Sequence, residues 1–172
     1  MVPKLAPLPP LRFVRTVLKS FMNESGLEPR LLGANNIRVT NAVKGKVDFE
    51  LDISKDHTNR LSILHGGTIA SMVDLGGSLA VASTGLYATG VSTDLNVTYL
   101  SSGGLVGDKV KATAVCDKIG KTLVYTTITF QNQKGELAAR GSHTKFVKHA
   151  FKSQSEPFVA PANVDLAEDD KP

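Results

Sequence analysis

A carboxylate and a glycine in one short segment have the chemistry to act on the same carbonyl group. Asp74 lies inside an otherwise apolar stretch, and a carboxylate there costs free energy unless it is hydrated or hydrogen-bonded. Gly66 follows His65 at the start of that stretch. A glycine at a helix start leaves backbone N–H groups uncovered, where they can bind an anion or a developing oxyanion. The segment therefore offers a proton acceptor and an oxyanion-binding group.

The spacing of these two groups has a consequence for assembly. Gly66 and Asp74 are separated by about 12 Å on a continuous helix, at 1.5 Å per residue, whereas a base and an oxyanion donor must both reach one carbonyl. Two chains related by a two-fold axis satisfy this requirement, and the spacing therefore predicts a dimer with shared sites. Two structural alternatives stay open. Asp74 could face solvent or be satisfied by Ser71 and Ser78, and His65 could be a buried, hydrogen-bonded histidine.

The elements that must position these residues follow from hydrophobic periodicity. Apolar residues at helical spacing and almost no charge predict a buried helix over residues 67–83. Alternating patterns and glycine turns predict six strands, at residues 36–43, 46–54, 91–101, 109–118, 121–132 and 136–148. Short turns between consecutive strands imply an antiparallel sheet, and the apolar helix must be wrapped by it. We therefore expect an α+β fold.

Composition and charge predict a single main domain with two extensions. The chain has 172 residues, 20 basic and 16 acidic, and we expect an N-terminal extension with an amphipathic helix over residues 1–35, a domain over 36–150 and a disordered acidic tail over 151–172. The basic N-terminal helix either docks on the domain or is a mitochondrial presequence. We favour docking and a cytoplasmic location, with a mitochondrial one as the alternative.

Several function classes are excluded or disfavoured by what the sequence lacks. Basic residues are scattered and tryptophan is absent, which argues against nucleic-acid binding. The longest uncharged stretch is broken by glycines and hydroxyl residues, so we expect no integral membrane contact. No serine-elbow motif, phosphate loop or dinucleotide fingerprint is present, and the four histidines lack metal-ligand spacing. We expect neither a metal nor an organic cofactor.

Several motifs resemble the hotdog-fold acyl-CoA thioesterases, in particular the phenylacetate-pathway type and its animal relatives. They cover roughly residues 12–148 and keep their register. The motifs are His57-Thr58-Asn59, Leu64-His65-Gly66-Gly67, Val73-Asp74, the run from Val91 to Leu100, Gly120-Lys121-Thr122 and His143-Thr144-Lys145. The resemblance implies a hotdog fold, with an antiparallel sheet wrapped around the long helix, and a homodimer or homotetramer with shared active sites.

The resemblance also assigns roles within the predicted site. The Gly66 N–H would polarise the thioester carbonyl, and Asp74 would activate the attacking water. Ser92 would hold that water, while Asn59 and His65 would support the site from the partner subunit.

By the same resemblance, a second group of residues would contact the coenzyme A part of the substrate. These are Tyr99, Lys118, Gly120, Lys121, Thr122 and, with less support, Lys145. The implied function is hydrolysis of acyl-CoA to a free acid and coenzyme A. The alternatives are an enoyl-thioester hydratase or dehydratase of the same fold, and a non-catalytic acyl-CoA-binding hotdog protein.

Overall fold

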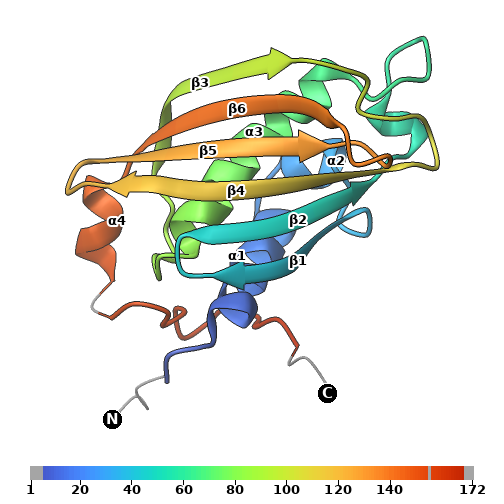
Figure 1. The fold of residues 1–172 in the computed structure, drawn as a ribbon. Coiled ribbons are helices and arrows are strands. Elements are labelled where there is room, and N and C mark those ends of the chain that lie inside the picture. The colour runs from blue at the N-terminus through green and yellow to red at the C-terminus, as the bar shows by residue number, and fades with distance from the viewer. Residues whose placement is uncertain (1–5, 155, 169–172) are drawn as a thin grey trace.

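A curved antiparallel sheet packs against one long helix, α3 (Gly66–Ala82), in the computed structural model, which describes residues 6–154 and 156–168. Figure 1 shows α3 crossing the concave face of the sheet. The strands are β1 (Ile37–Val43), β2 (Lys46–Asp52), β3 (Val91–Tyr99), β4 (Lys109–Ile119), β5 (Leu123–Gln131) and β6 (Leu137–Phe146). Their order is β1-β2-β4-β5-β6-β3. The predicted long helix and six strands are therefore confirmed.

Helix α3 is buried because its side chains and its backbone both contact the sheet. Most of its residues are buried, as its near lack of charge predicts. Two adjacent glycines let the sheet approach closely. A Cβ at Gly76 would lie 2.9 Å from the ring of Phe49, and one at Gly77 would lie 2.3 Å from Nδ1 of His143. Glycine costs about 1 kcal/mol relative to alanine within a helix, and here it makes room for these two rings.

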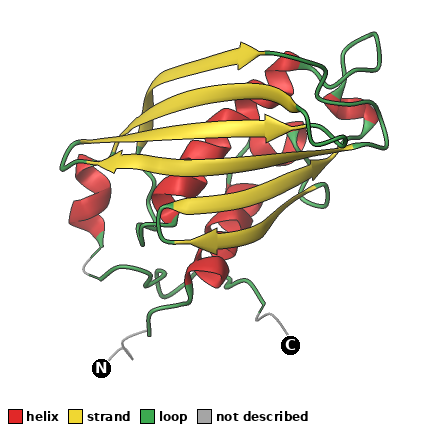
Figure 2. Cartoon of the chain, viewed as in Figure 1, coloured by secondary structure: helices red, strands yellow, loops and turns green. Residues whose placement is uncertain are grey.

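The sheet buries one face by strict alternation. In β5, Val124, Thr126, Ile128 and Phe130 are buried, whereas the residues between them are exposed or half-buried. This period of two is the pattern of a strand with one face on the core. Figure 2 shows that α3 and α1 lie on the same side of the sheet, so the opposite face is left to solvent.

Strand β3 forms one edge of the sheet and pairs only with β6 among the described residues. Eight of its nine residues are exposed, including Val91, Leu95 and Tyr99. A long edge strand with exposed apolar side chains is a surface on which another strand can pair.

The N-terminal helix α1 (Pro10–Glu24) docks on the domain. Phe13, Val14 and Val17 are fully or almost fully buried and belong to the same core cluster as α3 and the sheet. The boundary expected at residue 35 therefore does not separate two cores. A single turn, α2 (Glu28–Leu31), and a 3-10 turn, η1 (Lys55–His57), complete the N-terminal half. None of the helices within the described ranges is long and apolar enough to cross a membrane.

The segment predicted to be a disordered tail makes specific contacts in its described part. After α4 (Lys148–Ser153), residues 156–168 run along α1 (Figure 1). The Phe158 ring packs edge-on against Phe13 at 5.5 Å, and the Leu8 N–H donates to the Phe158 carbonyl at 2.9 Å. Farther along, Arg12 Nε donates to the Ala167 carbonyl at 3.0 Å. Hydrogen bonds to Phe158 and Ala167 from the Leu8 backbone and the Arg12 side chain, with one aromatic contact, thus hold this segment against the domain, while residues 169–172 lie outside the described ranges.

Candidate active site

Asp74 is the centre of a small polar network between α3 and the β3 edge. Its side chain is 51% exposed, Ser92 Oγ donates to its Oδ1 at 3.2 Å, and Nε2 of His143 lies 3.4 Å from the same oxygen. Ser71 and Ser78 instead donate to backbone carbonyls of α3. The alternative in which these two hydroxyls satisfy the carboxylate is therefore not what the structure shows. The Asp74 carboxylate is therefore partly exposed, and the side chains that orient it come from the sheet, not from α3.

The pairing of β3 with β6 brings the other two members of this network to Asp74. Ser92 lies opposite Lys145, and Leu95 lies opposite His143, with a register shift between Ser92 and Asp94. Such an irregularity increases the local twist and re-aims side chains next to it.

His143 is neutral and acts as a hydrogen-bond donor in this network. The ring is 0% exposed, and burial, together with the nearby charge of Lys145, lowers the pKa of His143 to about 4. Nδ1 has no hydrogen-bond partner among the described residues. A proton on Nε2 instead can be donated to Ser92 Oγ at 2.9 Å, and we assign this tautomer on that ground. The hydrogen bonds then run from His143 to Ser92 and from Ser92 to Asp74.

Lys145, which was expected to contact phosphate, is almost fully buried. Its residue is only 3% exposed, on the same face of β6 as His143. Burial lowers the pKa of Lys145, and the Asp74 charge partly offsets that effect. The burial of the residue does not support the expected phosphate contact, which stays a prediction.

The start of α3 forms the second half of the site. His65 is the N-cap residue, and its Nδ1 accepts a hydrogen bond from the Gly67 N–H at 2.7 Å. The Tyr99 hydroxyl donates a hydrogen bond to the Gly66 carbonyl at 2.7 Å. The Gly66 N–H has no acceptor within the described part of the chain. This unused donor at a helix N-terminus is where an oxyanion would bind.

Asn59 holds the loop that leads into α3. Its side-chain oxygen accepts hydrogen bonds from the N–H groups of Leu61 and Ile63, at 2.9 and 3.2 Å. The neighbouring His57 is buried and its Nε2 lies 2.9 Å from the Leu32 carbonyl. Asn59 therefore shapes the approach to Gly66, and His57 has a structural role.

The two halves of the candidate site do not meet within one chain. Gly66 is the first residue of α3, and Asp74 lies eight residues farther along the same unbroken helix, which separates them by about 12 Å. The structure thus brings Asp74 and Ser92 together, brings His65, Gly66 and Tyr99 together, and keeps the two groups apart.

The expected coenzyme A residues of the β4–β5 turn lie at the surface. Lys118, Lys121 and Thr122 are exposed, and the turn is closed by a hydrogen bond from the Gly120 N–H to the Leu123 carbonyl at 2.8 Å. Tyr99 is also exposed, at the other end of β3 from Ser92.

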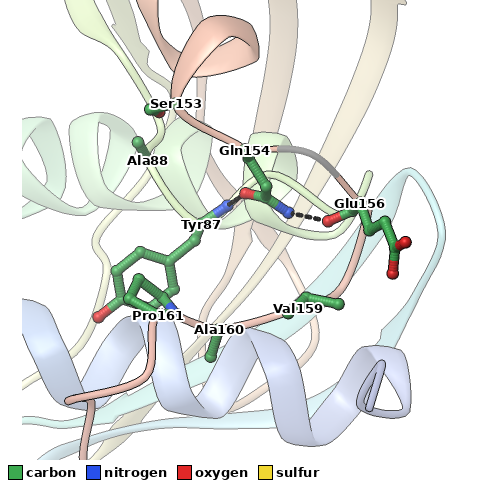
Figure 3. A pocket seen from close by; sticks show the side chains of 8 residues that line it. All are labelled: Tyr87, Ala88, Ser153, Gln154, Glu156, Val159, Ala160 and Pro161. Atoms are coloured by element: carbon green, nitrogen blue, oxygen red, sulfur yellow. Dashed lines mark hydrogen bonds between the residues drawn. The ribbon is translucent and has the colours of Figure 1, made fainter. Parts of the chain in front are cut away.

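Other features of the surface do not compete with this site. A hollow of about 270 Å³ lies between Tyr87 and the tail. Among its lining residues, drawn in Figure 3, Gln154 accepts a hydrogen bond from the Tyr87 N–H and donates one to the Glu156 carbonyl. Its lining contains no residue of the Asp74 network. No group of three or more potential metal ligands occurs among the described residues.

Sequence reasoning missed the role of His143. The motif His143-Thr144-Lys145 was visible, but 69 positions separate His143 from Asp74. The alternation in β6 could have placed His143 on the buried face. A histidine on the buried face of the sheet could then have been proposed as a partner of Asp74 on the buried helix.

Comparison with known proteins agrees with this geometry. The sequence profile described as "Thioesterase superfamily" matches residues 61–139. A Schizosaccharomyces pombe protein described as "Putative esterase C31F10.02" is 42% identical over 160 residues, which cover 92% of this chain and 94% of the relative. Human acyl-coenzyme A thioesterase 13 is 39% identical over 133 residues, 77% of this chain and 92% of the human protein.

A solved structure shows the same arrangement of helix and sheet. Zebrafish thioesterase superfamily member 2 superposes with a TM-score of 0.72 at 34% identity, over 81% of this chain and 98% of the zebrafish chain. The predicted hotdog fold is confirmed by this match and by the strand order. With its fold, its sequence profile and relatives of this similarity in agreement, the chain belongs to the thioesterase superfamily and is a thioesterase.

Proposed function

We propose that the protein hydrolyses acyl-CoA thioesters to a free acid and coenzyme A, with Asp74 as the base that activates water. The observation that carries this proposal is the network in which His143 donates to Ser92 and Ser92 donates to Asp74. It holds a half-exposed carboxylate in one orientation. The name of the human relative, acyl-coenzyme A thioesterase 13, supports the substrate class.

The proposed site is shared between two copies of the chain. The N–H of Gly66 has no acceptor within the described residues of its own chain, and Asp74 is too far along the same helix to act beside it. Pairing of two β3 edges would build a homodimer, alone or within a homotetramer, and bring Gly66 to the partner subunit's Asp74. His65 and Asn59 then hold the helix start, while Tyr99 fixes the Gly66 carbonyl.

Each step of the reaction uses a group described above. The thioester carbonyl oxygen accepts a hydrogen bond from the Gly66 N–H, which stabilises the charge that develops during attack. Asp74 of the partner subunit takes a proton from water as the water oxygen bonds to the carbonyl carbon. The tetrahedral intermediate expels the coenzyme A sulfur, which receives the proton, and the C–S bond breaks.

Hydration or dehydration of an enoyl thioester, the alternative activity, is less well supported by the geometry. A hydratase or dehydratase would use a histidine and a carboxylate as proton carriers at neighbouring carbons. His143 is fully buried, its pKa is lowered to about 4, and it already interacts with Ser92. His65 Nδ1 already accepts a hydrogen bond from the Gly67 N–H, so neither histidine is placed as a proton carrier through these atoms.

The deciding experiment compares wild type with Asp74→Asn on short, aryl and long acyl-CoAs and on enoyl-CoA. We expect thioester hydrolysis by wild type and a loss of about two orders of magnitude in turnover for Asp74→Asn, the scale for a positioned base, with unchanged oligomeric state. Near-wild-type turnover in Asp74→Asn would contradict the mechanism. Hydration of enoyl-CoA without thioester cleavage would contradict the function.

We further propose a cytoplasmic location. Residues 10–24, the segment that could have been a presequence, supply buried side chains to the core. Imaging of a C-terminal fluorescent fusion in the source cells tests this, and a mitochondrial signal would contradict it.

A further inference from the structure

Helix α4 is attached to the β4–β5 turn at one end of the sheet. The N–H of Val147, the residue before α4, donates to the Thr122 carbonyl at 2.8 Å. Figure 1 shows α4 directly beneath this turn. The helix and the turn therefore form one continuous surface.

Two large apolar side chains are exposed on this surface. Ile119, at the end of β4, is 44% exposed and Phe151, in α4, is 41% exposed. Together with Gly120 and Lys121 they line a hollow of about 340 Å³. A second hollow of about 280 Å³ also has Ile119 and Phe151 in its lining, together with Glu156, so the anionic groups of a ligand belong on the Lys121 side of the pair. An aromatic ring next to open space can act as a stacking platform for a flat ligand.

The two chain segments that carry this pair are basic. They contain four exposed lysines, Lys118, Lys121, Lys148 and Lys152, of which Lys121 lines the hollow of about 340 Å³. Lys148 and Lys152 are four positions apart in α4, so they lie on one side of the helix, and Phe151 is within one turn of both. Segments 118–122 and 148–153 contain no carboxylate. The complementary ligand therefore combines a flat apolar ring with several negative charges.

The surface lies within reach of the proposed reacting centre. Ser92 pairs with Lys145 in β6, and Lys145 pairs with Val124 in β5. Neighbouring strands are about 4.8 Å apart, which puts the Ser92 and Val124 backbones roughly 10 Å from each other. The β4–β5 turn begins just beyond Val124. An extended pantetheine chain can cover this span.

We propose that α4 completes the coenzyme A site, with Phe151 stacking on the adenine ring and Lys148 and Lys152 binding phosphate groups. The proposal rests on the proposed function, which supplies an acyl-CoA substrate. It extends the site beyond residues 61–139, which match the superfamily profile. The β4–β5 turn alone offers lysines but no aromatic ring, and α4 supplies one.

The experiment separates nucleotide binding from chemistry. KM and kcat are measured for one acyl-CoA and for the acyl-pantetheine thioester with the same acyl group, in wild type, Phe151→Ala and Lys152→Glu. Matched controls at the opposite end of the sheet are Leu137→Ala, which is also exposed (45%), and Lys134→Glu in the β5–β6 turn. Binding of free coenzyme A is measured by titration calorimetry.

We expect Phe151→Ala to raise KM for acyl-CoA about fivefold or more, the lower end of what loss of an aromatic stacking partner costs. Lys152→Glu should raise it in a salt-sensitive way. In both variants kcat and the kinetics with acyl-pantetheine should stay unchanged, and Kd for coenzyme A should rise in parallel with KM. The controls should behave as wild type.

Three results would overturn the proposal. They are unchanged coenzyme A binding in both variants, equal losses with both substrates, and the absence of coenzyme A binding by wild type. Loss of binding to phosphatidylserine vesicles in Phe151→Ala, with unchanged KM, would identify a membrane surface instead. Because calorimetry needs no turnover, coenzyme A binding through Phe151 by a protein that cleaves no thioester would contradict only the proposed function.

Discussion

Titration of His143 gives the sharpest test of the network around Asp74. The pKa of this residue falls from 6.5 in the unfolded chain to about 4 in the folded one, mainly through burial. A folded-state pKa below the unfolded one means that the unfolded state binds the proton first. Stability from this group is therefore complete above pH 6.5 and is lost as the pH falls toward 4.

The size of the effect follows from the two pKa values. At pH 4.5 the unfolded histidine is almost fully protonated, whereas the folded one is mostly neutral, so lowering the pH from 7 to 4.5 costs about 2–3 kcal/mol of unfolding free energy. His143→Gln removes the titration and places an amide N–H near the position of Nε2, so the hydrogen bond to Ser92 can persist.

The measurement is urea unfolding of wild type and His143→Gln at pH 7 and pH 4.5, at fixed protomer concentration. Other titrating groups are common to both proteins and cancel in the difference. We expect the pH-induced loss to be smaller in His143→Gln by about 2 kcal/mol. His149→Gln, which replaces an exposed histidine of α4, is measured beside it as the control. An equal pH dependence in wild type and His143→Gln would refute the assignment of a buried, neutral histidine.

Three further predictions address packing, assembly and substrate binding. Gly77→Ala places a Cβ 2.3 Å from His143 Nδ1; it should displace the ring and lower both melting temperature and turnover, and a fully active, equally stable variant would contradict the packing. A mixture of inactive Asp74→Asn and inactive Gly66→Pro subunits should regain partial activity, because hybrid dimers hold one intact site; no recovery despite demonstrated subunit exchange would argue against a shared site. Lys121→Glu should raise KM for acyl-CoA in a salt-sensitive way with turnover kept, and equal loss with a thioester lacking the nucleotide would place Lys121 in the architecture instead.

The fold was predictable because its periodicity is clear. Val47, Phe49 and Leu51 alternate with acidic residues and face the core. The near absence of charge in α3 correctly predicted a helix wrapped by the sheet. These patterns are local, so they could be read without knowing which strands pair.

The candidate site was only partly predictable because it depends on pairing across the sheet. Asp74 and Gly66 were identified from one segment, but His143 meets Asp74 only because β3 skips β4 and β5 to pair with β6. The contacts of the tail were not predictable for a different reason. Its order depends on backbone groups, such as the Ala167 N–H that donates to Thr16 at 3.0 Å, and composition does not report such contacts.

The attachment of the tail to α1 has a consequence for synthesis of the protein. Arg12 and Ala167 are joined although 155 positions separate them, so α1 is translated long before the segment that completes its contacts. Contacts this distant in sequence form slowly, because a long loop must close before they stabilise anything. On the ribosome, the surface of α1 that receives residues 156–168 therefore stays uncovered until that segment has been translated. During that interval the exposed apolar side chains of α1 can make non-native contacts.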